Sequence, residues 1–143
     1  MAQVGLLEDN MRVAHMCATM LNYVGHQVTI YKHPCECLHA LLPDLKSLHS
    51  KQSLYEPPTI YPLPVDVLIL DLYLPGIDGV EVLRHLKSHP RTQELPLIFC
   101  TAAPPSEVAR VIQVVPHVAV IEKPFKLQTL TSAIAVALGA QTK

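Results

Sequence analysis

The sequence predicts an α/β fold in which helices cover both faces of one parallel sheet. Short aliphatic runs alternate with segments of helical periodicity along most of the chain. The strongest run, Val67–Leu70, contains no polar residue before Asp71, which is typical of a strand buried on both faces. At 143 residues the chain is long enough for one full core and too short for two ordinary domains. We therefore expect one three-layer α/β domain over residues 1–143.

Composition narrows the class of protein further. Half of the residues are hydrophobic, 16% are charged, and the formal net charge is -1. No Lys/Arg run is present, which argues against direct nucleic-acid binding, and no apolar run reaches membrane-spanning length. Acidic residues appear at Glu8 and Asp9, too early for a secretory signal, so a cytoplasmic location with reduced cysteines is expected. Cys35 and Cys37 form C-x-C without a second pair at metal spacing, which is an incomplete zinc pattern.

The first third of the chain predicts two strands and two helices. Val4–Leu7 is a short apolar run, and Asn10 after it can cap a helix that ends at Gly25. Gln27–Tyr31 alternates as a second strand does, and Pro34 suits the first turn of a second helix. The two strand–helix units give the first half of the predicted sheet.

A proline-rich insertion interrupts this alternation over residues 43–64. Prolines at this density cannot lie in a central strand or continue a helix. We interpret the segment as a helix extension near residues 44–50 followed by an extended loop, which is either functional or mobile. The prolines are Pro43, Pro57, Pro58, Pro62 and Pro64.

The alternation resumes after the insertion. The remaining elements are a strand ending at Asp71, a helix over Val80–Ser88, a strand over Leu95–Cys100, a helix opened by Pro104 and Pro105, a strand over His117–Glu122 and a last helix closed by Gly139. In the helix after Pro105 the spacing i, i+3, i+4, i+7 places Val108, Val111, Ile112 and Val115 on the inward face.

Polar residues stand at the carboxyl end of four of these strands. Because the carboxyl ends of parallel strands lie at one edge, where such sheets bind ligands, we expect these side chains to meet there. The residues are Glu8, Asp9, Asp71, Thr101 and Lys123. On its own Asp71 could equally cap the following helix; the shared edge favours a functional site.

The acidic residues at this edge predict a magnesium site. Carboxylates a few ångströms apart repel one another unless one is protonated or a cation joins them. Oxygen ligands of this kind suit Mg2+, which keeps waters for a phosphate to replace. We assign Asp9 and Asp71 as direct ligands, Glu8 as a ligand through water, and the backbone carbonyl of Tyr73 as a further ligand.

The other two polar residues complete an arrangement for phosphoryl transfer. Lys123 supplies a fixed positive charge and Thr101 a hydroxyl donor beside the carboxylates. Cations stabilise charge on the transferring oxygens, and a carboxylate can act as the nucleophile. Asp71 is therefore the expected phosphoacceptor, forming an aspartyl phosphate.

These residues together resemble the response-regulator receiver domain of two-component signalling. The resemblance rests on Leu7–Asn10, on Asp71 with Pro75–Gly76 and Asp78–Gly79, on Thr101–Ala102, and on Lys123–Phe125. Thr101 follows Asp71 by 30 residues and Lys123 follows Thr101 by 22, spacings that are usual in such receivers. The likeness covers nearly the whole chain except the insertion.

The resemblance implies a flavodoxin-like fold with strand order 2-1-3-4-5 and a phosphorylation-dependent switch. A sensor histidine kinase or a phosphotransfer protein would supply the phosphoryl group to Asp71 with Mg2+, and an output partner or domain of unknown identity would read the change. Thr101, Ala102 and Lys123 would bind the phosphoryl group. Such a domain catalyses only its own phosphorylation and dephosphorylation. This chain departs from the family pattern at Val120, where an aromatic residue is usual. The departure puts the coupling between phosphorylation and output in question.

The sequence argues against two other functions. A phosphatase that resembles haloacid-dehalogenase enzymes would need a second Asp two residues after the nucleophile, and Tyr73 occupies that position. The alternative is a phosphorylation-independent protein-binding module with the receiver fold. The presence of all five polar residues argues against it, since a scaffold does not need them together.

Overall fold

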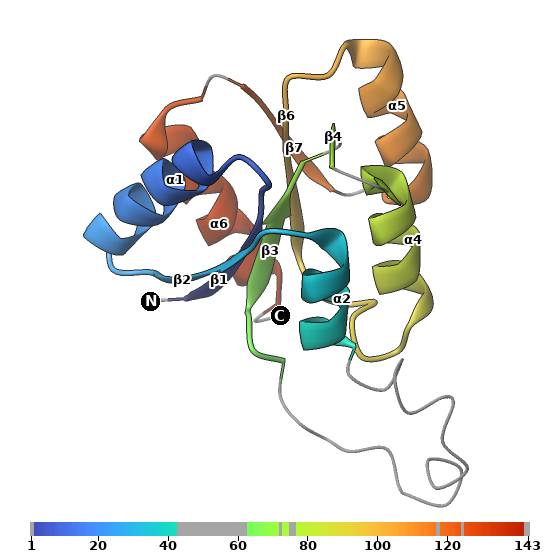
Figure 1. Cartoon of the computed structure of the whole chain (residues 1–143), viewed down its shortest axis with the longest axis horizontal. Helices are drawn as coiled ribbons and strands as arrows, with labels where there is room; N and C mark the ends of the chain where they lie inside the picture. The colour runs from blue at the N-terminus through green and yellow to red at the C-terminus, as the bar shows by residue number, and fades with distance from the viewer. Residues whose placement is uncertain are drawn as a thin grey trace, which may run out of the picture.

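The computed structural model of the chain confirms the predicted three layers, with a five-stranded parallel sheet between two layers of helices (Figure 1). It describes residues 2–42, 63–71, 73–74, 77–116, 118–123 and 125–141. The predicted helix extension near residues 44–50 and most of the insertion lie outside these ranges.

The sheet has the predicted topology. Its strands in chain order are β1 (Gln3–Leu7), β2 (Gln27–Tyr31), β3 (Val67–Leu70), β6 (Leu97–Thr101) and β7 (Ala119–Glu122). Their order across the sheet is β2-β1-β3-β6-β7, which is 2-1-3-4-5 when the five strands are numbered along the chain. The chain reverses its winding direction beside β1, so the crevice at the carboxyl edge opens between β1 and β3.

Helices lie on both faces of the sheet. They are α1 (Met11–Tyr23), α2 (Pro34–Leu41), α4 (Gly79–Ser88), α5 (Pro105–Val114) and α6 (Leu127–Gln141). In Figure 1, α1 and α6 lie on one side of the sheet and α2, α4 and α5 on the other.

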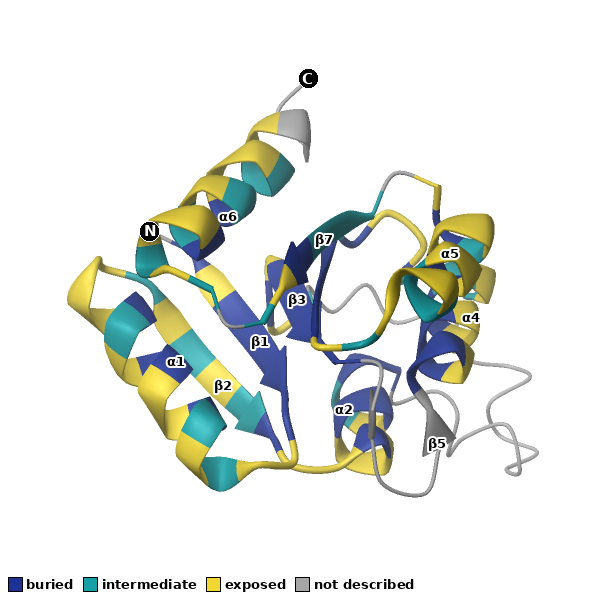
Figure 2. Ribbon diagram, turned by 90° about the horizontal axis from the view of Figure 1, so that it is seen from above, coloured by how far each residue is buried: buried dark blue, intermediate teal, exposed yellow. Residues whose placement is uncertain are grey.

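The core divides into two apolar clusters, one on each face, and β3 contributes to both. Leu68 and Leu70 belong to the cluster under α2, α4 and α5, whereas Val67 and Ile69 belong to the cluster under α1 and α6. All four residues are buried, and β3 is dark blue in Figure 2. Since full burial of one such side chain contributes about 1.5–3 kcal/mol, this central strand is the rigid base on which Asp71 stands.

Both ends of α1 follow the predicted signals. The Asn10 side chain accepts hydrogen bonds from the N–H groups of Arg12 and Val13, at 3.1 and 3.3 Å, and so caps the helix. Gly25 follows the helix with φ of +99°, a left-handed conformation that side chains with a Cβ rarely adopt. The cap fixes where the chain leaves Asp9 and enters the helix.

Gly25→Ala is expected to lower the free energy of unfolding by about 1 kcal/mol, because a Cβ disfavours the left-handed backbone. Nothing lies within 4 Å of the added methyl group, so the cost comes from the backbone alone. Gly139→Ala is the matched control: it has equal room, lies in α6 without a positive φ, and should leave stability unchanged or raise it. Urea unfolding followed by circular dichroism compares the two; equal losses would contradict this explanation.

The structure corrects several expected boundaries. The fourth strand starts at Leu97 rather than Leu95, and α6 continues through Gly139 to Gln141 because that glycine has no positive φ to end the helix. Ile112, expected on the inward face of α5, is 45% exposed. A two-stranded antiparallel ribbon, β4 (Tyr73–Leu74) with β5 (Ile77–Asp78), was not predicted.

The ends of the insertion are anchored at the amino edge of the sheet, opposite Asp71. Helix α2 ends at Leu41, and the Leu41 carbonyl accepts a hydrogen bond of 3.0 Å from Arg91 Nε. Strand β3 begins at Val67 on the same edge, and Asp66 before it accepts a 2.8 Å hydrogen bond from the N–H of Gln3. The described residues on both sides of the insertion therefore lie away from the predicted site.

The four cysteines are free thiols, as expected. In the described part of the chain no helix is long and apolar enough to cross a bilayer.

Candidate functional site

The carboxyl edge of the sheet gathers four of the predicted residues on four different strands. Glu8 follows β1, Asp71 follows β3, Thr101 ends β6 and Lys123 follows β7. The Lys123 N–H donates to the Thr101 carbonyl at 3.0 Å, so that strand pairing continues up to the lysine. The sheet itself therefore sets the positions from which these side chains meet.

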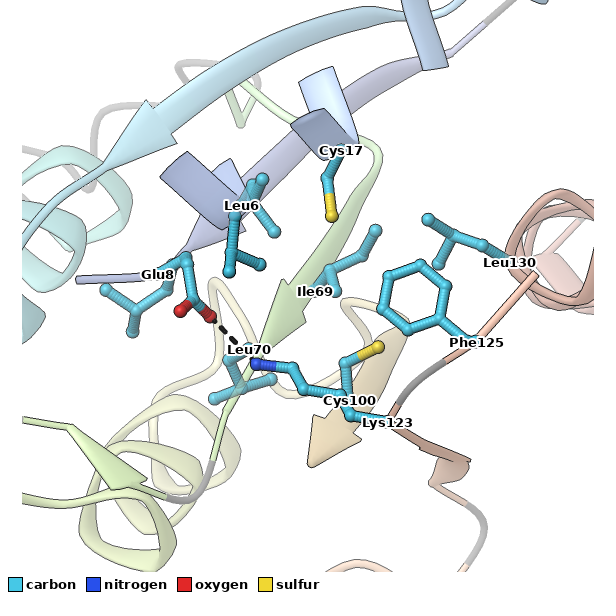
Figure 3. Close-up of a pocket in the computed structure, with 11 residues that line it drawn as sticks. Leu6, Glu8, Cys17, Ile69, Leu70, Cys100, Lys123, Phe125 and Leu130 are labelled. Atoms are coloured by element: carbon cyan, nitrogen blue, oxygen red, sulfur yellow. Dashed lines mark hydrogen bonds and ion pairs between the residues drawn. The ribbon is translucent and has the colours of Figure 1, made fainter. Parts of the chain in front are cut away.

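Lys123 joins the two acidic residues. Its Nζ lies 2.8 Å from Asp71 Oδ2 and 3.3 Å from Glu8 Oε2. Figure 3 shows the Glu8 and Lys123 side chains pointing toward each other from opposite sides of Leu70. One ammonium thus bridges carboxylates from β1 and β3 while its own backbone continues β7.

Burial and charge act against each other in this cluster. Burial raises the pKa of Glu8; the Lys123 ammonium partly offsets the effect and the Asp71 charge adds to it. Burial alone would lower the pKa of Lys123, but its hydrogen bond to Asp71 and the charges of Asp71 and Glu8 outweigh burial and raise it. The ammonium is therefore held charged at neutral pH, as charge stabilisation at the site requires.

The predicted magnesium ligands differ in their surroundings. Asp9 is exposed, whereas Glu8 and Asp71 are 6% and 8% exposed and face Lys123. Tyr73 begins β4, two residues beyond Asp71, and pairs with Asp78. Among the residues placed by the structure, no three His, Cys, Asp or Glu side chains form a ready metal cluster. Carboxylate and carbonyl oxygens are the donors that Mg2+ prefers, so the residue types fit this metal. Lys123 offsets only one of the two carboxylate charges of Glu8 and Asp71.

Thr101 is oriented by the loop that follows it. The residue is 1% exposed, and its Oγ1 accepts a 3.0 Å hydrogen bond from the N–H of Ala103. Because a hydroxyl can donate and accept at once, its proton stays available for an acceptor at the carboxyl edge. Ala102 between them is exposed.

An apolar cavity of about 10 Å³ lies beneath the ion pairs (Figure 3), a space for at most about one water molecule. Cys17 and Cys100 line it with Phe125. Burial raises the pKa of the Cys100 thiol to about 12 and also raises that of Cys17, so both remain neutral and unreactive at physiological pH. The cavity belongs to the packing under the site.

A much larger hollow of about 1010 Å³ lies at the opposite, amino edge, beside the starts of β6 and β7 and the C-terminal half of α6. Its lining includes Leu97, Ala119 and Val136 and none of the acidic residues of the site. The larger hollow therefore does not coincide with the cluster of Glu8, Asp71, Thr101 and Lys123.

The sequence did not predict the direct ion pair between Glu8 and Lys123. It indicated only that Glu8 binds Mg2+ through water. Val4–Leu7 are all buried, and burial continues through Glu8 before the chain emerges at Asp9. An acidic residue that directly continues a buried strand is a signal for a paired carboxylate, because an unpaired buried charge costs several kcal/mol, roughly, in a folded protein.

A doubly wound sheet with buried acidic residues, a threonine and a lysine at its carboxyl edge defines a class of signalling domain. The family model for the response regulator receiver domain matches residues 4–135. The chain belongs to the response-regulator receiver family of two-component systems, as the sequence resemblance indicated.

Solved structures have the same architecture. A putative response regulator from Chloroflexus aurantiacus superposes with a TM-score of 0.75 at 25% identity, covering 96% of this chain and 98% of that one. A CheY-like receiver domain protein from Methanospirillum hungatei superposes with a TM-score of 0.74 at 19% identity, covering 98% and 95%. The second likeness supports the fold alone.

Curated relatives match over shorter stretches. The phosphate regulon transcriptional regulatory protein PhoB of Rhizobium meliloti is 51% identical over 37 residues, which are 26% of this chain and 16% of PhoB. The response regulator PleD of Caulobacter vibrioides is 43% identical over 37 residues, which are 26% of this chain and 8% of PleD. The matched stretches span 16% of the length of PhoB and 8% of the length of PleD.

Proposed function

We propose that this domain is a phosphorylation-controlled switch that accepts a phosphoryl group on Asp71. The contact of 2.8 Å between Asp71 Oδ2 and Lys123 Nζ carries the proposal. It places a cation against one oxygen of a carboxylate that ends a rigid, buried strand. A sensor histidine kinase or a phosphotransfer protein is the proposed donor, and the cytoplasm is the expected location.

The proposed transfer is a single displacement at phosphorus. An Asp71 carboxylate oxygen attacks the phosphorus of a phosphohistidine, the new O–P bond forms, and the P–N bond breaks with its electrons returning to the imidazole. Lys123 stabilises charge on the transferring oxygens, and the Thr101 hydroxyl donates a hydrogen bond to one of them. Mg2+, when bound by Asp9, Asp71 and the Tyr73 carbonyl with Glu8 through water, would supply further charge neutralisation.

We propose that the conformational change on phosphorylation is transmitted through the loop after Thr101. If Thr101 moves toward the phosphoryl group, its hydrogen bond to Ala103 draws the start of α5 with it. Val120 is half-buried and packs on the same apolar cluster as Ala103, so it is too short and too enclosed to report the movement at the surface. The two states would therefore differ mainly between residues 101 and 115.

Beryllofluoride, a phosphoryl mimic, tests this route when added with Mg2+ to isotopically labelled protein. Amide NMR shifts should change most in residues 101–115 and little around Val120. The Asp71→Asn variant under the same conditions is the control for binding elsewhere. Large shifts centred on β7, with the loop unchanged, would contradict the route.

The alternative, a phosphorylation-independent binding module, makes a different prediction. Its partner would bind the wild type and Asp71→Asn equally, and a phosphodonor would change neither affinity.

A further inference from the structure

We propose that Tyr31 is a positioning residue that holds Glu8, and through it the acidic edge, in place for the proposed phosphoryl transfer. The inference rests on the proposed function for its consequence in chemistry, but the positioning itself can be measured without phosphate or metal. Two features of Tyr31 support this role: its carbonyl accepts a hydrogen bond from the Glu8 N–H, and its ring is buried in the core.

The Tyr31 carbonyl binds the backbone of Glu8. Tyr31 is the last residue of β2 and lies opposite Leu7, the last residue of β1. The Glu8 N–H donates to the Tyr31 carbonyl at 3.1 Å, one hydrogen bond beyond the paired strands. The position of the Glu8 backbone therefore depends on where the end of β2 is held.

Besides its pairing with β1, the end of β2 is anchored by one buried side chain. Strand β2 is an edge strand of the five-stranded sheet, and its burial runs exposed, half-buried, exposed, half-buried, buried from Gln27 to Tyr31. Tyr31 is 4% exposed and belongs to the same apolar cluster as Leu7, Cys37 and Leu38. The ring thus fixes the end of β2 between the sheet and α2.

Gly5 provides the room for this ring. A Cβ at Gly5 would lie 3.2 Å from Tyr31 Cε2, and 3.1 Å from both Leu68 Cδ1 and Val65 Cγ1. These distances are tighter than ordinary van der Waals contact, so the ring lies directly against the glycine in the middle of β1. Gly5 and Tyr31 together set the register between the ends of β1 and β2, and β1 leads directly into Glu8.

Two contacts connect Glu8 to Asp71, the proposed phosphoacceptor, through Lys123. Glu8 Oε2 lies 3.3 Å from Lys123 Nζ, and the same nitrogen lies 2.8 Å from Asp71 Oδ2. A shift of the Glu8 backbone would move a buried carboxylate relative to the ammonium that faces Asp71. Tyr31 acts on the site through Glu8 and does not touch the reacting atoms.

Amide hydrogen exchange in the metal-free protein tests the positioning. In Tyr31→Ala the protection of the Glu8 amide should fall by about tenfold relative to the Lys123 amide, since its hydrogen bond loses its anchor. The Lys123 amide is the internal control because it makes the equivalent bond to Thr101 on the other side of the sheet, at 3.0 Å. Tyr31→Phe should keep the wild-type ratio. Ile30→Ala, which truncates the neighbouring residue of β2 packed on the opposite face, should keep it too.

A purely structural Tyr31 would lower protection of both amides together, and an unchanged ratio in Tyr31→Ala would overturn the proposal. If Tyr31→Ala does not fold, Tyr31→Leu replaces it, because leucine still fills part of the cluster without covering Gly5.

A second measurement connects positioning to the site. Calorimetric Mg2+ titration should give a dissociation constant about fivefold or more higher in Tyr31→Ala than in Tyr31→Phe, because a displaced acidic edge loses ligand geometry. A changed amide ratio with unchanged Mg2+ affinity would overturn the consequence for the site. If wild-type protein takes up no phosphoryl group, the proposed function fails while the exchange result still decides the role of Tyr31.

Discussion

Asp71→Asn is expected to abolish phosphorylation while the domain stays folded. An amide has no nucleophilic oxygen of comparable strength, and the substitution keeps the shape of a side chain that is 8% exposed. Lys123 still has Glu8 as a partner at 3.3 Å, so the midpoint of thermal unfolding should move by no more than about 5 °C. Incorporation of labelled phosphate from acetyl phosphate with Mg2+ measures the first effect, and circular dichroism measures the second.

Asp66→Asn is the matched control, because Asp66 precedes the same strand at the opposite edge of the sheet. Its amide oxygen can still accept the hydrogen bond from the Gln3 N–H, so the strand start should be kept, and phosphate uptake should not change. Uptake by Asp71→Asn at the wild-type stoichiometry would show that the phosphoacceptor is a different residue.

Lys123→Met is expected to be the most destabilising substitution at the site. It leaves Glu8 and Asp71 facing each other without the cation, and removal of one partner from a largely buried pair costs about 2–4 kcal/mol. The Lys123 side chain is 21% exposed and its partners are 8–10% exposed, so solvent screens the pair only in part. Phosphate uptake should also fall, since the transferring oxygens lose their fixed positive charge.

The pH dependence identifies the origin of this loss. The pKa of Lys123 is raised above the ordinary 10.5, through Asp71 and Glu8 against the effect of burial. Its contribution is therefore present below pH 10.5 and disappears as pH rises through the raised value. The difference in unfolding free energy between wild type and Lys123→Met should be full at pH 7 and 9 and shrink above pH 10.5. A difference that stays constant across this range would mean that Lys123 contributes through packing alone.

How much the sequence could predict depends on how locally each feature is determined. The uninterrupted run before Asp71 predicted a strand buried on both faces, and the structure buries all four residues from Val67 to Leu70. The placement of Thr101 and Lys123 followed from the rule that parallel strands end at one edge, and the 3.0 Å bond between their backbones bears it out. Features set by strand order and burial were thus predictable.

Features set by tertiary packing were not. The helical spacing put Ile112 inward, but α5 buries only Val111 fully within the helix, so the apolar stripe is wider than the surface that covers it. The direct Glu8–Lys123 contact depends on how far a long side chain reaches across two strands, which no spacing along the chain encodes. The ribbon of β4 and β5 consists of two-residue strands, too short to produce a periodic pattern.

The position of the phosphoryl group tests the central claim most directly. Protein treated with acetyl phosphate and Mg2+ would be reduced with borohydride, which converts an aspartyl phosphate to homoserine, and then digested and sequenced by mass spectrometry. We expect homoserine at position 71 in the wild type and nowhere in Asp71→Asn. Homoserine at Asp9 or at any other acidic residue, or a phosphoryl group stable to borohydride on a hydroxyl or histidine side chain, would contradict the assignment of Asp71 as the phosphoacceptor.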